Sequence, residues 1–190
     1  MMQALLFVLC EKPVKSDALF IYGSQGDELL DQKELEAASK FYLEKFAPKI
    51  VLNGISAHES RRKNIAYIGY EPWFLNLMER GVSEKDILLI PASKHTAEES
   101  KNILNLSEKM GWQTLTIMST PYHQLRSFLT IIALTKERKN NIRIHNQTFS
   151  LERTDWSREM TKLVLNGEMA VSAGNVNGNM EAHISAEFER

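Results

Sequence analysis

The feature that most constrains this fold is an alternation of short apolar runs with segments of helical periodicity. ALFIYG (18–23) is a continuous apolar run that ends in glycine, typical of a strand buried on both faces. KIVLNG (49–54), DILLIPAS (86–93) and TLTIMST (114–120) are the next three strand candidates. A further run, IRIHNQTF (142–149), alternates apolar and polar residues, which is typical of a more exposed strand. The alternation predicts a Rossmann-like, doubly wound α/β fold, with three layers around a mostly parallel sheet of about five strands.

The segments between these runs carry apolar residues at helical spacing. The expected helices are marked by Leu35, Ala38, Tyr42 and Phe46 before Pro48, by 73–80 before Gly81, by Ile103, Leu106 and Met110 before Gly111, and by Leu125, Leu129 and Ile132. Residues 55–70 are polar and basic, and we interpret them as a loop or a short insertion.

Length and composition limit the functional classes. The 190 residues predict one α/β domain over 1–166, followed by a tail over 167–190 that is packed on the surface or partly disordered. A formal net charge of -1 gives no electrostatic basis for a nucleic-acid or membrane partner. Cys10 is the single cysteine, which excludes an internal disulfide and a cysteine-rich zinc site. No window reaches membrane length and the start lacks signal-peptide features, so we expect a cytoplasmic protein; its oligomeric state stays open.

Polar residues collect where the predicted strands end. Ligands of open parallel sheets bind outside the carboxyl ends of the strands, so these residues are expected to converge on one edge. The candidates are Gly23, Ser24 and Gly26 after the first strand, Asn53 and Gly54 after the second, Ser93, Thr96 and Glu98 after the third, and Ser119, Tyr122, His123 and Arg126 after the fourth.

The glycine loop and the helix after the third strand each have a structural alternative. GSQG (23–26) is either a tight turn or a loop whose free N–H groups bind an anion; it lacks the third glycine of a dinucleotide fingerprint. Thr96 and Glu99 match a helix capping box, which leaves Glu98 unexplained. A glutamate in a first helical turn is also favoured by the helix dipole.

His123 and Arg126 are three residues apart, so on a helix that starts near Tyr122 they share a face. The alternative is a polar pair that faces solvent. Arginine offers a planar fork of donors suited to phosphate or carboxylate, and histidine carries protons near neutral pH. The histidines show no metal-ligand spacing, so we predict no structural metal; a weakly bound divalent cation held by Asp27, Glu28 or Glu98 stays open.

Four segments resemble the YdcF-like family, the bacterial domain of unknown function 218 that includes SanA and ElyC-type proteins. They are SDALFIYGSQGDE, IVLNG, GVSEKDILLIPASKHTAEES and TIMSTPYHQLRS, within about residues 16–150. Ser93, Thr96 and Glu98 match the family's Ser-x-x-Thr-x-Glu-Asn segment, with Glu99 in place of asparagine. Ser119, Tyr122, His123 and Arg126 match its last segment, whereas Asn53, Gly54 and Ile55 replace Ser-Gly-Gly and only Gly23 and Gly26 remain of its first glycine cluster.

The resemblance implies a Rossmann-like fold with a polar site that acts on a small anionic substrate, a nucleotide or a phosphorylated compound. In this hypothesis Arg126 and the amides of 23–26 bind the anion, while Glu98 and His123 perform acid–base chemistry in a hydrolase or transferase. Asn53, Ser93, Thr96 and Ser119 orient the substrate. The alternative is a module that binds a nucleotide such as S-adenosylmethionine without chemistry.

Overall fold

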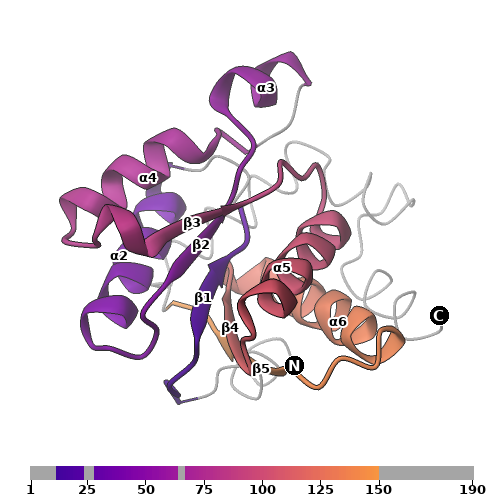
Figure 1. Ribbon diagram of the computed structural model, residues 1–190. Helices are drawn as coiled ribbons and strands as arrows, with labels where there is room; N and C mark the ends of the chain where they lie inside the picture. The colour runs from indigo at the N-terminus through magenta and orange to yellow at the C-terminus, as the bar shows by residue number, and fades with distance from the viewer. Residues whose placement is uncertain (1–11, 24–27, 64–66, 150–190) are drawn as a thin grey trace. The chain divides into compact units, whose positions relative to one another are not determined.

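The five predicted strands form one sheet in which every neighbouring pair is parallel. The computed structural model describes residues 12–23, 28–63 and 67–149, so the tail over 167–190 lies outside the described residues. The strands are β1 (Ala18–Ile21), β2 (Ile50–Asn53), β3 (Ile87–Ile90), β4 (Thr114–Met118) and β5 (Arg143–Gln147), in the spatial order β3-β2-β1-β4-β5 (Figure 1). Chain order reverses between β1 and β4, as in Rossmann-like folds.

The helices follow the strands and cover both faces of the sheet (Figure 1). They are α2 (Glu28–Leu43), α3 (Ala57–Arg62), α4 (Tyr70–Glu79), α5 (Thr96–Met110) and α6 (Pro121–Glu137), with a 3-10 turn over Glu84–Asp86. Helices α2 and α4 contact each other on one side, and α5 and α6 contact each other on the other side. The predicted three-layer α/β fold is therefore confirmed.

Strand β1 shows how the sequence builds two cores at once. All four of its residues are buried, because side chains alternate between the two faces of the sheet. Leu19 and Ile21 pack in the apolar cluster with α2 and α4, while Ala18 and Phe20 pack in the cluster with α5 and α6. A continuous apolar run is what a strand buried on both faces requires.

The structure departs from the sequence prediction in α3 and in the buried side of α6. Residues 57–62, expected to be loop, form helix α3, whose start is capped by the Ser56 hydroxyl accepting from the Glu59 N–H at 3.1 Å. Helix α6 forms as predicted, but Leu125 and Leu129 are only partly buried. Its buried side instead carries Gln124, Ser127, Ile131 and Thr135. The Ser127 and Thr135 hydroxyls donate to the His123 and Ile131 carbonyls at 3.1 and 2.7 Å, and the Gln124 amide nitrogen donates to the Asn146 side-chain oxygen.

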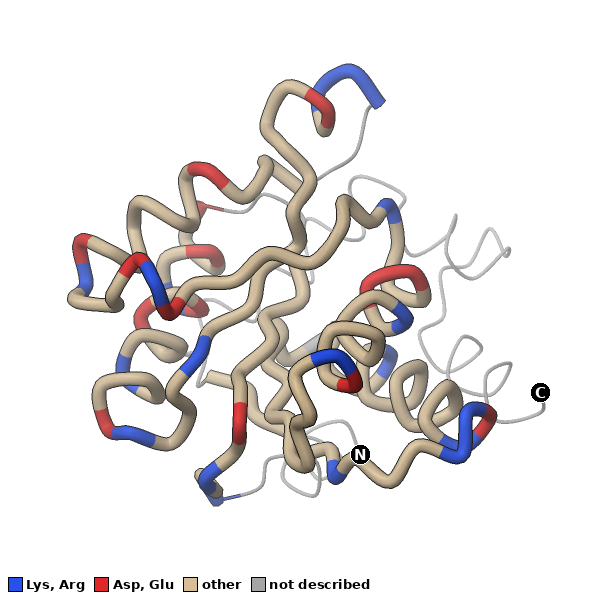
Figure 2. Tube along the Cα trace, viewed as in Figure 1, with Lys and Arg blue, Asp and Glu red and all other residues tan. Residues whose placement is uncertain are grey.

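The charged residues of the described chain are of both signs and interspersed, with Arg61 and Arg62 in the last turn of α3 (Figure 2). In the described ranges every helix falls short, in length or in continuous hydrophobicity, of what a bilayer crossing requires.

Candidate functional site

The loops that leave β1, β2, β3 and β4 all start at the same edge of the sheet, because the strands are parallel. We call this edge the carboxyl edge. The reversal between β1 and β4 places the starts of α5 and α6 on one side of it (Figure 1). The predicted site residues that the structure describes lie at the strand ends, in these loops and in the first two turns of α5 and α6.

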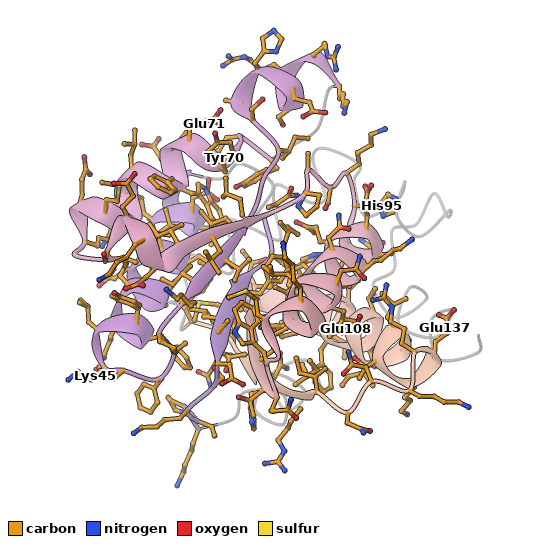
Figure 3. All side chains as sticks on the ribbon, in the orientation of Figure 1. Lys45, Tyr70, Glu71, His95, Glu108 and Glu137 are labelled. Carbon is orange, nitrogen blue, oxygen red and sulfur yellow. The ribbon has the colours of Figure 1, made fainter. Side chains whose placement is uncertain are left out.

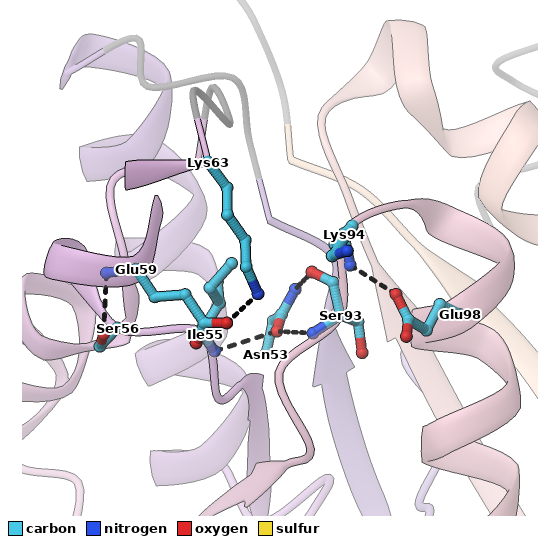
Figure 4. A network of polar contacts seen from close by, with 8 residues as sticks. All are labelled: Asn53, Ile55, Ser56, Glu59, Lys63, Ser93, Lys94 and Glu98. Atoms are coloured by element: carbon cyan, nitrogen blue, oxygen red, sulfur yellow. Dashed lines mark hydrogen bonds and ion pairs between the residues drawn. The ribbon is translucent and has the colours of Figure 1, made fainter. Parts of the chain in front are cut away.

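Asn53 ties the loops after β2 and β3 together (Figure 4). Its side-chain oxygen accepts from the N–H groups of Ile55 (3.1 Å) and Ser93 (3.0 Å). Its amide nitrogen donates to the Ser93 carbonyl (2.8 Å) and to Oε1 of Glu99 (3.0 Å). An asparagine side chain has two donor and two acceptor positions, and protein groups fill all four. Asn53 therefore fixes the site's framework.

Ser93 is held in the same framework rather than presented to a ligand. It is 2% exposed, its hydroxyl donates to the Pro91 carbonyl at 2.8 Å, and it accepts from Asn102 at 2.9 Å. The two contacts join Ser93 to its own loop and to the second turn of α5. Because protein groups occupy the side chains of Asn53 and Ser93, these residues would orient a substrate indirectly, by fixing the conformation of the loops after β2 and β3.

The N-terminus of α5 is capped differently from the prediction. The N-cap is His95, whose Nδ1 accepts from the Glu98 N–H at 3.2 Å, and Oε2 of Glu98 accepts from the Lys94 N–H at 2.8 Å (Figure 4). The His95 side chain lies at the exposed start of the helix (Figure 3). The predicted Thr96–Glu99 capping box is therefore wrong by one residue, and Glu98 is the residue that the cap uses.

Glu99, which the sequence assigned to the cap, is instead a buried carboxyl at the centre of the carboxyl edge. It is 6% exposed, and it accepts hydrogen bonds from the Asn53 amide and from the Gly23 N–H. Burial, assisted by the neighbouring charge of Glu98, raises the pKa of Glu99 to about 7, although both hydrogen bonds act in the opposite direction. Glu99 can hold or release a proton near neutral pH.

His123 and Thr96 join the first turns of α6 and α5. The Thr96 hydroxyl lies 3.3 Å from Nε2 of His123, and the His123 ring meets the Tyr22 ring edge-on at 6.3 Å between centroids. Burial of the imidazole and repulsion by the Arg126 guanidinium lower the pKa of His123 to about 4. His123 is thus neutral at physiological pH, and Arg126, exposed one turn later, is close enough to act on it.

Two glycines are required by close contacts. A Cβ on Gly54 would lie 2.3 Å from the Ile90 carbonyl oxygen, and a Cβ on Gly23 would lie 2.8 Å from the Tyr67 ring. These contacts give both glycines a packing role at the strand ends.

The other predicted site residues divide into two groups. Ser119 is 1% exposed, and its carbonyl accepts from the Thr148 hydroxyl at 2.9 Å, so it lies inside the framework. Ser24, Gly26 and Asp27 lie outside the described residues, as does the side chain of Tyr122, whose backbone belongs to α6.

Glu34 on α2 is a buried carboxyl that sequence reasoning missed. It is 0% exposed, and neither of its oxygens has a hydrogen-bond partner among the described residues. Burial, and then repulsion by Asp31 and Glu99, raises its pKa well above the ordinary range. A signal existed: position 34 lies four residues after Leu30 and four before Ala38, on the core-facing side of the helix.

Glu99 carried the same kind of signal, because it precedes the buried Ile103 by four residues. Among the residues that the structure describes, no three or more His, Cys, Asp or Glu side chains are grouped so as to hold a metal ion.

The fold and the polar carboxyl edge define a Rossmann-like α/β protein with a candidate ligand site at the strand ends. Comparison with models of known protein families found no match, and a search among curated proteins found none either. Membership of the YdcF-like family therefore stays a prediction from the sequence.

Proposed function

We propose that this protein is a YdcF-like enzyme that acts on a small anionic substrate, such as a phosphorylated compound, by hydrolysis or group transfer. The contact between Thr96 and His123 at 3.3 Å carries the proposal, because it joins the two loops that the sequence predicted to share a site. The Asn53 hydrogen bonds, which join the loops after β2 and β3, support it further.

The anion-binding part of the proposal rests on Arg126. Its guanidinium is exposed in the second turn of α6, close enough to His123 to lower the imidazole pKa. A bound phosphate or sulfate would offset that positive charge and accept a hydrogen bond from the imidazole. The N-terminus of α6 would favour the same anion, since helix N-termini carry partial positive charge.

A nucleotide such as S-adenosylmethionine fits the described residues less well than a smaller anion. Rossmann-like proteins hold a ribose hydroxyl with a carboxylate near the end of the second strand. Here β2 ends at Asn53, and all its hydrogen-bonding positions are filled by protein groups. We therefore place a phosphorylated compound before a nucleoside in the proposal.

One observation favours the rival function, a module that binds without chemistry. Glu98, which the sequence assigned to acid–base work, is used to cap α5 through the Lys94 N–H. If no other carboxyl group replaces Glu98 in acid–base chemistry, the site would bind an anion without transforming it.

The test is a ligand screen by thermal shift with sulfate, inorganic phosphate and a panel of phosphate esters, followed by turnover assays on the esters that stabilise the protein. Arg126→Ala is expected to weaken sulfate binding roughly 10- to 100-fold, the cost of a lost charged hydrogen bond. Arg143→Ala is the matched control, because Arg143 is exposed at the opposite, amino end of β5. Absence of stabilisation by any of these anions would refute the proposed function.

A further inference from the structure

We propose that Glu99, rather than Glu98, is the acid–base carboxyl of this site, and that Asn53 is the residue that positions it. This inference rests on the proposed function, because it assigns a chemical role within the same site. The residue it concerns, Glu99, lies in the first turn of α5.

The placement of Glu99 distinguishes it from its neighbour. Glu98 points back to the chain before α5 and bonds the Lys94 N–H, whereas Glu99 points inward and bonds groups from the loops after β1 and β2. Successive helix positions differ by about 100° around the axis, so the two carboxyls face different surroundings. Of these two carboxyls, Glu99 is the one that bonds groups at the ends of β1 and β2.

Tyr22 connects Glu99 to His123. The Tyr22 ring meets the His123 ring edge-on, its hydroxyl bonds the Ser100 hydroxyl at 2.6 Å, and the charge of Glu99 acts on its pKa. Thr96, three residues before Glu99, contacts the same imidazole. The imidazole of His123 and the charge of Glu99 therefore both act on one buried side chain, that of Tyr22.

Titratable and polar groups from several parts of the fold interact with Glu99. Gly23 after β1 and Asn53 at the end of β2 bond Glu99, and Glu98 adjoins it on α5. The charge of Glu99 acts on Glu34 of α2, on Tyr22 after β1 and on Tyr67 before α4. Asp31 of α2 acts in turn on Glu34, and on α6 His123 contacts Thr96 and is acted on by Arg126. Glu34 is fully buried with both oxygens unpartnered among the described residues, which favours the neutral, proton-bearing form of that side chain. The two groups that donate hydrogen bonds to Glu99, the Asn53 amide and the Gly23 N–H, are uncharged. They therefore favour the charged carboxylate less strongly than a lysine or arginine partner would.

The chemistry of a phosphate ester illustrates the role. Glu99 in its acid form donates its proton to the leaving oxygen as the bond between that oxygen and phosphorus breaks. The oxygen of an attacking water forms the new bond to phosphorus, and the neutral imidazole of His123 accepts the proton that this water loses. Proton exchange with solvent then restores both groups, so the ester and one water give an alcohol and phosphate.

The experiment measures sulfate affinity as a function of pH, because sulfate itself does not titrate near neutrality. In the wild type the affinity is expected to fall roughly tenfold between about pH 6 and about pH 8.5, as Glu99 becomes negatively charged beside the anion. Glu99→Gln, which keeps the shape and an acceptor oxygen for Asn53, is expected to abolish this dependence. Glu108→Gln, at the exposed far end of the same helix (Figure 3), is expected to behave as the wild type.

Asn53→Ala tests the positioning role. Loss of the amide donor is expected to move the pH midpoint of sulfate affinity upward, because that hydrogen bond favours the charged form of Glu99. A merely structural Asn53 would change stability and leave the midpoint in place.

Three outcomes would overturn the inference: a pH dependence that survives Glu99→Gln, one that Glu98→Gln abolishes instead, or a midpoint unmoved in Asn53→Ala. If sulfate and phosphate bind at no pH, the proposed function fails, and the role of Glu99 is tested by a second experiment.

That experiment is a carbon-13 titration of the glutamate carboxyls in the wild-type protein, which requires no variant to fold. A neutral-range midpoint for Glu99 supports its proton-carrying role, and a midpoint in the ordinary acidic range refutes it.

Discussion

Replacement of Glu34 by methionine is expected to stabilise this protein, and the gain is expected to grow with pH. The side chain is 0% exposed and its two oxygens lack partners among the described residues, so methionine loses no hydrogen bond there. Removing a buried polar group without a partner is worth about 1–3 kcal/mol. Methionine has a similar length and adapts to irregular space in a core.

The pH dependence follows from the direction of the pKa shift. Burial first, and then Asp31 and Glu99, raises the pKa of Glu34 well above its ordinary value of 4.5. A group with a raised pKa contributes its full stability below the unfolded pKa and loses it as pH rises toward the folded pKa. The wild type therefore loses up to about 1.4 kcal/mol per pH unit in that window, and Glu34→Met does not.

Urea unfolding at about pH 5 and about pH 7 measures this difference. The stabilisation by Glu34→Met should be larger at the higher pH, with the m-value unchanged. Ser39→Ala is the control, because this buried hydroxyl of α2 bonds the Leu35 carbonyl at 2.6 Å and does not titrate. A Glu34→Met gain that is equal at the two pH values would refute the reasoning and show that the Glu34 charge is satisfied in the folded protein.

Three further outcomes are expected. Gly54→Ala should cost about 1–3 kcal/mol in urea unfolding, because its Cβ would lie 2.3 Å from the Ile90 oxygen; an unchanged midpoint would contradict that contact. Tyr22→Phe should cost about 1 kcal/mol, and a double-mutant cycle with Ser100→Ala should show coupling through their 2.6 Å hydrogen bond. Sulfate binding at about pH 5 should take up protons in calorimetry with two buffers, since the anion raises the His123 pKa from about 4; His123→Gln should remove that uptake.

The strands could be predicted because burial on both faces leaves a plain sequence signal. The run over 18–21 is apolar at every position, and the structure buries all four residues. Helix α3 gave no such signal, because Ser60 is its only buried residue and no apolar stripe marks its six positions. A short helix held by its cap is not visible to a periodicity argument.

The start of α5 shows how a one-residue error changes the chemistry of a site. The pattern of Thr96 and Glu99 matches a capping box, but the chain enters the helix at Thr96, with His95 as the N-cap. Because of this one-residue shift, Glu98 accepts the hydrogen bond from the Lys94 N–H at the helix start, and Glu99 points inward to Asn53. Periodicity from Ile103 backward would have placed position 99 on the buried side, so the core register was the better guide than the terminal motif.

The proton-binding character of this site follows from the fold more than from any single motif. A parallel sheet brings the ends of β1, β2 and β3 together, and the fully bonded Asn53 leaves Glu99 as the ionisable group between them. Glu34 lies on α2, which packs on the face of the sheet opposite to α5. In the described interior, the buried carboxyl of Glu99 has hydrogen-bond donors, whereas that of Glu34 has none. Burial acts in opposite directions on acids and bases, which makes Glu99 an acid and His123 a neutral acceptor at the same pH. An exposed carboxylate and an exposed imidazole in the same loops would keep ordinary pKa values and would not divide into an acid and a neutral acceptor. The buried Glu99, rather than the capping residue Glu98, is therefore the residue to test first.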